Sequence, residues 1–84
     1  MDNKVLVELN VPSIDEIFNV FLPCSKKIGN IIVLLNKSLN DITNGSFKIS
    51  DSNFLYNKAT GEKYDINIFL KDSSIKNGTR LVLY

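Results

Sequence analysis

Few residues of this chain are of the types that carry out catalysis or bind metals. The 84 residues include no histidine and one cysteine, Cys24. Zinc sites need clustered Cys and His ligands, and general acid–base catalysis needs a positioned pair of titratable groups. The nine carboxylates lie along the chain without the spacing of such a pair. We therefore expect neither an enzyme nor a metal site, and no cofactor.

The strongest candidate nucleophile is Cys24. Lys26 and Lys27 follow it, and a helix is expected to begin nearby. Positive charge and a helix N-terminus favour the reactive thiolate. However, the chain has no second Cys and no His to act with it. We favour the simpler interpretation, a small residue accepted in a turn, and a single cysteine also fits a reducing compartment.

Composition indicates one small domain, residues 1–84. Ten basic and nine acidic residues give a net charge of +1, and the two signs are well mixed. No basic stripe is present, so we expect neither nucleic acid nor an anionic membrane as partner. The longest apolar run, residues 31–35, is far too short to insert across a bilayer. Residues 1–4 lead straight into a strand without a secretory signal, which predicts a cytoplasmic protein.

The N-terminal quarter predicts a β-hairpin. Residues 4–11 and 17–22 both alternate with period two, as half-buried strands do, and residues 12–15 (Pro-Ser-Ile-Asp) form a turn. One face of the hairpin is apolar throughout and consists of Val5, Val7, Leu9, Val11, Phe18, Val20 and Leu22.

The period then changes to that of an amphipathic helix over residues 26–40. Ser25 is expected to cap its start, and Asn44-Gly45 to end it. The apolar stripe consists of Ile28, Ile31, Ile32, Leu35, Leu39 and Ile42. The rest of the chain predicts an irregular stretch (residues 47–51), short strands at 54–56 and 62–64 around a turn at 57–61, a loop with a helical turn at 66–75, and a last strand at 79–84.

This β-β-α-β-β-β order predicts an α+β fold, with the helix packed across one face of a mixed sheet of four to five strands. The last strand should lie parallel beside the first. We expect the helix to cover one apolar face made of Val5, Val7, Leu9, Phe18, Val20, Leu22, Phe54, Tyr56, Leu81 and Leu83.

The closing segment, residues 69–84, resembles that of a ubiquitin-like β-grasp domain. The resemblance implies that Leu70 and Ile75 pin a short turn to the core, and that Asp72 caps this turn. Asn77-Gly78 would supply the positive φ that leads into the last strand. Modifiers and sulfur carriers of this fold need a tail ending in Gly-Gly, whereas this chain ends on Leu83-Tyr84.

Two further segments narrow the resemblance to the YukD/EsaB family, small bacterial ubiquitin-like proteins encoded with type VII secretion systems. These are Val-Phe-Leu-Pro23 followed by Ile28-Gly-Asn-Ile-Ile, and the end Ile75-x-x-Gly78-x-x-Leu81-x-Leu83. Residues 46–53 and 57–64 show no pattern of that family. The resemblance implies protein binding, with components of the secretion machinery or a second copy of the chain as partners.

Strand parity predicts where a partner would bind. The helix covers one sheet face only, so apolar residues out of phase with the core should form a patch on the other face. Leu6, Leu55 and Val82 should be neighbours there. The predicted protein-binding residues are Leu6, Phe21, Leu55, Arg80, Val82 and Tyr84.

Other interpretations remain. Scattered surface hydrophobes are normal, and loop residues such as Phe47 or Phe69 could cover the stripe. The solvent face of the helix, with Val33 and Lys37, is a weaker candidate interface. An unrelated β-grasp adaptor is the main functional alternative, and a modifier or sulfur carrier with an unusual terminus is a lesser one.

Overall fold

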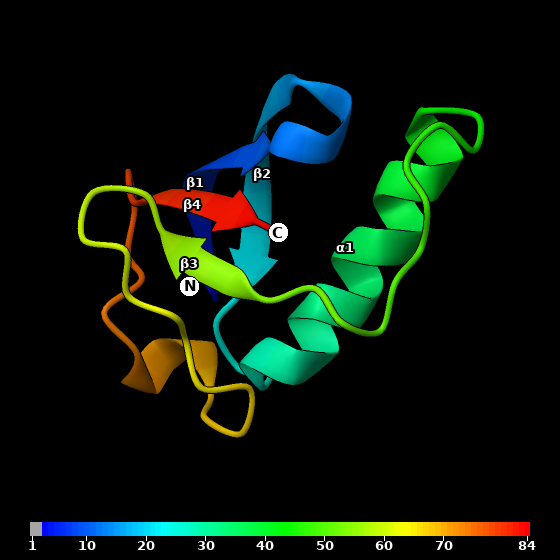
Figure 1. Cartoon of the computed structure of the whole chain (residues 1–84). Coiled ribbons are helices and arrows are strands. Elements are labelled where there is room, and N and C mark those ends of the chain that lie inside the picture. The colour runs from blue at the N-terminus through cyan, green and yellow to red at the C-terminus, as the bar shows by residue number, and fades with distance from the viewer. Residues whose placement is uncertain (1–2) are drawn as a thin grey trace.

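One helix lies against one face of a four-stranded mixed sheet (Figure 1). The structure is a computed structural model that describes residues 3–84, so the expectation about a signal at residues 1–4 lies partly outside the described residues. The elements are β1 (Lys4–Val11), β2 (Glu16–Pro23), α1 (Ile28–Ile42), β3 (Leu55–Asn57) and β4 (Arg80–Leu83), with short helical turns at Pro12–Ile14 and Leu70–Asp72.

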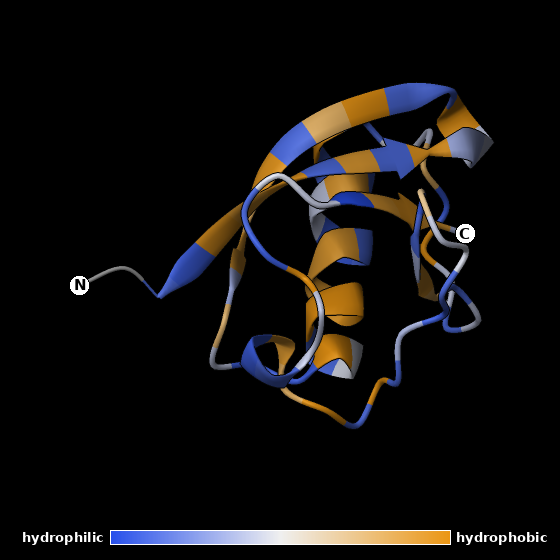
Figure 2. Cartoon of the chain, turned by 90° about the vertical axis from the view of Figure 1, so that its left-hand side faces the viewer, coloured by the Kyte–Doolittle hydropathy of each residue, from blue (hydrophilic) through white to orange (hydrophobic). Residues whose placement is uncertain are grey.

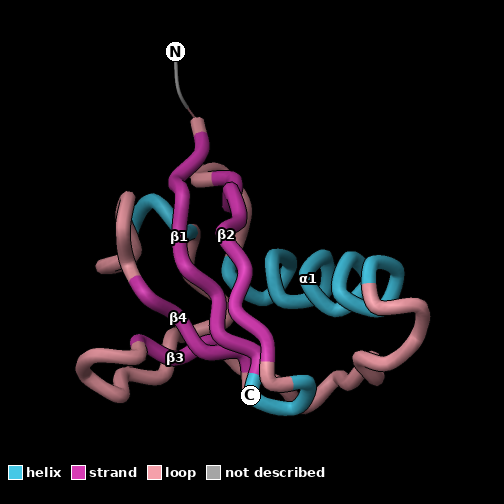
Figure 3. Tube along the Cα trace, turned by 90° about the horizontal axis from the view of Figure 1, so that it is seen from above, coloured by secondary structure: helices cyan, strands magenta, loops and turns pink. Residues whose placement is uncertain are grey.

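The strand order is β2-β1-β4-β3, and Figure 3 shows β1 and β2 side by side from above. β1 pairs antiparallel with β2 and parallel with β4, while β3 pairs antiparallel with β4. The parallel central pair is the one predicted from the sequence. The expected return strand at residues 62–64 is reduced to one bridge between Tyr56 and Lys63. The β-grasp architecture is therefore confirmed, with four strands.

The core lies between α1 and the sheet. Ile28, Ile32, Leu35 and Leu39 of the helix stripe are buried, as predicted, whereas Ile42 at the end of α1 is exposed. Figure 2 shows the helix behind the sheet, with hydrophobic (orange) residues along both. Toward the β2 edge, burial is incomplete. The predicted core residues Val5, Phe18 and Val20 are accordingly half-buried. Phe54 and Tyr56, also predicted for the core, lie at the opposite edge and are half-buried for another reason: the residue between them, Leu55, is the one that faces α1.

The start of α1 is capped by a loop and not by Ser25. The helix begins at Ile28, after a Lys27 N-cap that makes no side-chain hydrogen bond. The Ile28 and Gly29 N–H groups instead donate to the carbonyls of Ile68 and Ile66, each at 2.9 Å. This satisfies N–H groups that a helix start leaves free. The approach is close enough that a Cβ on Gly29 would lie 3.0 Å from the Ile66 oxygen.

The irregular segment after α1 is tied to the helix by side-chain amides. Asn44 and Gly45 have positive φ and end the helix as expected. Asn40 Nδ2 then donates to the Phe47 carbonyl, and Asn36 Oδ1 accepts from the Ser50 N–H at 2.9 Å. These bonds give residues 46–53 a defined path without regular structure.

The closing segment follows the expected plan with one change. Leu70 and Ile75 are buried, and Gly78 has a φ of 88° where the chain turns into β4. Ser73, and not Asp72, holds the turn. Its hydroxyl donates to the Leu70 carbonyl and accepts from the Ile75 N–H.

Candidate functional site: the outer face of the sheet

The sheet face opposite α1, here called the outer face, is built by strand alternation. Successive side chains of a strand point to opposite faces. The buried residues Val7, Leu9 and Leu81 fix which face is which. The outer-face residues are Leu6, Glu8 and Asn10 of β1, Ile17, Asn19 and Phe21 of β2, Tyr56 of β3, and Arg80 and Val82 of β4 with Tyr84 beyond it.

An apolar and aromatic group occupies one end of this face. Tyr56 is the register partner of Val82, and Val82 is in turn the partner of Asn10. Tyr84 continues β4 beyond Val82, with 74% of its surface exposed. We call Tyr56, Val82 and Tyr84 the aromatic cluster. Tyrosines with apolar neighbours suit protein interfaces, because they combine a large contact area with a polar end.

A shallow hollow of about 380 Å³ lies at this cluster and is lined by all three of its members together with Asn57, Lys58 and Gly61. Lys58 Nζ donates to Asn10 Oδ1 at 3.1 Å, which holds the ammonium group beside the cluster. Asn10 is itself buried and donates to the Leu81 carbonyl. The hollow therefore combines apolar walls with one fixed positive charge, and suits a partner that brings an apolar side chain and a carboxylate.

The other end of the outer face carries a separate apolar pair. Leu6 and Phe21 are direct register partners across β1 and β2, and 64% of Phe21 is exposed. Between the two ends runs a polar row, in which Glu8 pairs with Arg80 on one side and with Asn19 on the other. Arg80, predicted as a binding residue, lies in this row.

Two parts of the predicted patch are wrong. Leu55 is fully buried, because it lies opposite Leu83 on the face that α1 covers. Leu6 is not a neighbour of Val82. It lies level with Gly78, whose N–H donates to the Leu6 carbonyl. Asn10, the partner of Val82, lies four positions further along β1, about 13 Å away. Leu6, Phe21, Arg80, Val82 and Tyr84 do lie on the outer face.

Tyr56 was expected in the core that α1 covers, and this expectation is wrong, because Tyr56 pairs with Val82 on the outer face. The strand that holds it has three residues, and the local sequence Phe54-Leu55-Tyr56 is apolar on both parities. Only the register with β4 decides which of these three residues faces α1 and which face outward.

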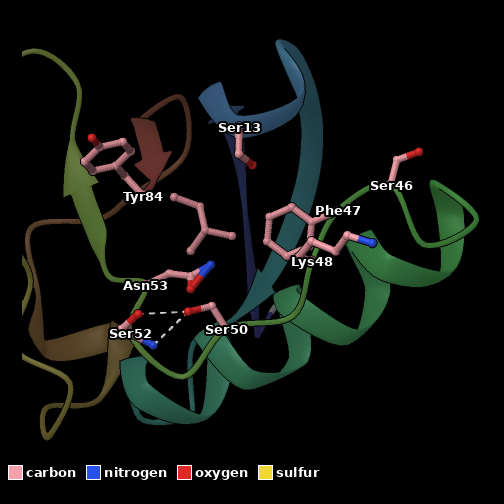
Figure 4. A pocket seen from close by; sticks show the side chains of 9 residues that line it. Ser13, Ser46, Phe47, Lys48, Ser50, Ser52, Asn53 and Tyr84 are labelled. Carbon is pink, nitrogen blue, oxygen red and sulfur yellow. Dashed lines mark hydrogen bonds between the residues drawn. The ribbon is translucent and has the colours of Figure 1, made fainter.

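A second pocket lies between the sheet and the segment after α1 (Figure 4). It measures about 290 Å³, and Phe47 and Leu83 form its apolar wall. Ser50 and Ser52 line it and hydrogen-bond to each other. Asn53 Oδ1 is buried there without a hydrogen-bond partner among the described residues. Ser13, Ser46, Lys48 and Tyr84 complete its lining.

The described residues offer little for other chemistry. No three His, Cys, Asp or Glu side chains of residues 3–84 are grouped closely enough to hold a metal ion. The thiol of Cys24 is free and half-buried, and it packs against the core. Within the same residues, no helix has the length and apolar character needed to cross a membrane. The outer face is the most distinctive surface that remains.

Comparisons with known proteins identify the fold. No protein-family model and no curated protein sequence matches the chain. Solved structures do match. The EccD5 ubiquitin-like domain from Mycobacterium xenopi superposes with a TM-score of 0.77 at 19% identity, covering 99% of this chain and 94% of that domain. This chain has the ubiquitin-like β-grasp fold.

Two other structures place the same fold in related settings. The ubiquitin-like domain of the Mycobacterium tuberculosis type VII secretion protein EccD1 has a TM-score of 0.72 at 12% identity, with 99% of this chain and 98% of that one covered. A chain of the ESX-5 inner membrane complex has a TM-score of 0.78 at 15% identity, and this chain spans 21% of its length. At these identities the likeness establishes the fold alone.

Proposed function

We propose that this chain is a ubiquitin-like protein-interaction domain that serves a bacterial type VII secretion system as a cytoplasmic accessory or regulatory component. The observation that carries the proposal is the aromatic cluster with its hollow on a sheet face that no helix of residues 3–84 covers. The likeness to EccD ubiquitin-like domains supports the link to secretion.

Binding would use the outer face in two parts. Val82 and the two tyrosines supply apolar contact area, and interface energy concentrates in a few such central anchors. Lys58 would then meet a carboxylate of the partner at the rim of the hollow. Leu6 and Phe21 at the other end would form a second contact. Glu8 and Arg80, which lie between the two contacts, would fix how the partner is aligned along the face. This favours a partner with apolar anchors flanked by acidic side chains.

The test is affinity capture from an extract of the host cells with three versions of the protein. Wild-type protein should retain components of the secretion machinery, identified by mass spectrometry. Val82→Asp should lose them, because it puts a charge at the centre of the cluster. Val33→Asp is the matched control, since Val33 is a valine exposed on α1 and far from the sheet face.

Capture of unrelated proteins, lost equally with Val82→Asp, would favour the alternative of an unrelated β-grasp adaptor. Capture that survives Val82→Asp but fails with Val33→Asp would move the interface to the helix. Each result requires that both variants melt close to the wild-type temperature.

A further inference from the structure

The two edges of the sheet are treated differently. β3, at one edge, is short, and the segment that follows it covers it. Tyr56 forms a bridge with Lys63, and the Tyr64 N–H donates to the Leu55 carbonyl at 3.0 Å. β2, at the other edge, has eight residues and an unbroken register with β1. The β1–β2 hairpin forms the upper border of the sheet in Figure 2, and no described segment lies beyond it there.

The unprotected nature of the β2 edge is unusual for a natural sheet. Edge strands are normally short, bulged, or carry charges or proline, because their free N–H and C=O groups pair readily with another strand. β2 has Glu16 at its first position and Pro23 at its last. The five residues from Ile17 to Phe21 are uncharged, and Ile17 and Phe21 are 60% and 64% exposed.

The hydrogen bonds of the hairpin show which β2 groups face outward. The Cys24 N–H donates to the Asn3 carbonyl, which marks Asn3 and Cys24 as a hydrogen-bonded pair. Hydrogen-bonded pairs alternate along an antiparallel ladder. Phe18 and Val20 therefore direct their backbone groups to β1, and Ile17, Asn19 and Phe21 direct theirs to the free edge. The bonds from β1 to β4 agree, since the Glu8 N–H donates to Thr79 and not to β2.

We propose that a second copy of this chain pairs with β2, antiparallel, about a twofold axis at Asn19. Only residues with outward backbone groups can form hydrogen-bonded pairs, so Asn19 faces Asn19 of the second copy. Ile17 then faces Phe21 of the second copy, and Phe21 faces Ile17. This register forms six backbone hydrogen bonds, two for each pair.

The side chains of this register are complementary on both faces. On the outer face, each exposed Ile17 packs on an exposed Phe21, a favourable type of cross-strand pair. On the core side, the half-buried Phe18 lies opposite Val20 of the second copy, which extends the apolar layer where burial is incomplete. The ends also match in charge. Glu16 opens β2 and Asp15 precedes it, and both approach the Pro23 end of the other copy, beyond which Lys26 and Lys27 follow.

A hollow beside the β2 edge leaves room on the core side. It measures about 560 Å³ and lies between Phe18 of β2 and Ile42 at the end of α1. The twofold axis is perpendicular to the sheet, so both helices lie on the same side. The dimer joins the two outer faces into one surface and leaves both aromatic clusters free for partners. This inference therefore does not depend on the proposed secretion role.

The first test measures the mass of the protein in solution against its concentration by sedimentation. Wild-type protein should pass from the 9.5 kDa monomer to twice that mass as concentration rises. Asn19→Pro should raise the dimer dissociation constant at least about tenfold, because it removes the N–H at the twofold axis. The same N–H takes no part in the ladder with β1, so the monomer should keep its fold. Ile17→Lys should weaken the dimer without altering the backbone, whereas Val33→Lys should not.

The second test fixes the register by thiol cross-linking in a Cys24→Ser background. Asn19→Cys should cross-link to itself with a short bismaleimide at least about ten times faster than Val33→Cys, because a hydrogen-bonded pair has its Cα atoms about 5.5 Å apart. A mixture of Ile17→Cys and Phe21→Cys proteins should form the mixed product in preference to either symmetric one.

A monomer at every concentration would overturn the proposal, and so would a dimer that Asn19→Pro and Ile17→Lys leave unchanged. Equal cross-linking of Asn19→Cys and Val33→Cys would overturn it as well, since it would indicate random collision.

Discussion

Tyr56 and Val82 are register partners on the outer face of the sheet, and the residues beside them, Leu55 and Leu83, are partners on the core face. One step along two strands thus separates the candidate interface from the hydrophobic core. This relationship gives opposite expectations for two chemically similar substitutions.

Leu55→Asp should unfold most of the protein, whereas Val82→Asp should not. Leu55 is fully buried, and an unpaired charge in a core costs about 3–5 kcal/mol, a large part of the stability of a small domain. Val82 is half-buried on the open face, and its replacement should cost about 1 kcal/mol. Thermal unfolding followed by circular dichroism measures both. Similar melting temperatures for the two variants would show that Leu55 does not face the core as described.

Residues such as Leu55 explain where sequence-based prediction succeeds and fails. β1 is long and strictly alternating, so its inward and outward faces follow from the sequence, as do the helix stripe and the Gly78 turn. β3 has three residues, and an apolar residue at every position of residues 54–56 leaves its phase open. Only its register with β4, a non-local contact, decides it.

The candidate site was predictable to the same degree. Phe21, Arg80 and Val82 were assigned to the outer face correctly, because parity alone decides their side. Which of these residues lie close together was not predictable, since it depends on the offset of β4 along β1. The cap of α1 was missed for a similar reason. The carbonyls that bind its N–H groups come from Ile66 and Ile68, far along the chain, while Ser25 is adjacent in sequence.

Asn36→Ala should loosen the segment that follows α1. The Asn36 side chain is buried, donates to the Ile32 carbonyl and accepts from the Ser50 N–H and the Asn53 amide. Removing it leaves two partly buried donors unpaired, at a cost of about 1 kcal/mol or more. Amide hydrogen exchange at Ser50 should become faster, and Lys37→Ala on the exposed side of α1 serves as control. Unchanged exchange at Ser50 would mean that this bond does not hold the segment.

Gly29→Ala should destabilise the protein although alanine favours helices. Helix propensity alone would add up to about 1 kcal/mol of stability. The new Cβ would lie 3.0 Å from the Ile66 oxygen, so the loop that caps α1 has to move away. We expect a lower melting temperature for Gly29→Ala and little change for Ser38→Ala at an exposed site of the same helix. A rise in melting temperature for Gly29→Ala would argue against the capping loop.

Cys24→Ser should change neither stability nor partner capture appreciably. The hydrogen bonds of this residue run through its backbone, to Asn3 and from Lys71, and survive the substitution. We expect a loss of stability of about 1 kcal/mol or less, from the half-buried thiol alone. Loss of captured partners by a Cys24→Ser protein of normal stability would assign the thiol a role.

Photo-cross-linking in the host cells tests the role of the outer face most directly, because it traps whichever protein lies against the labelled residue. Benzoylphenylalanine placed at position 84, in the aromatic cluster, should give discrete higher-mass adducts on illumination. The same group at Val33, on the exposed side of α1, should give none. Adducts from Val33 and none from Tyr84 would contradict the account and place the interface on the helix.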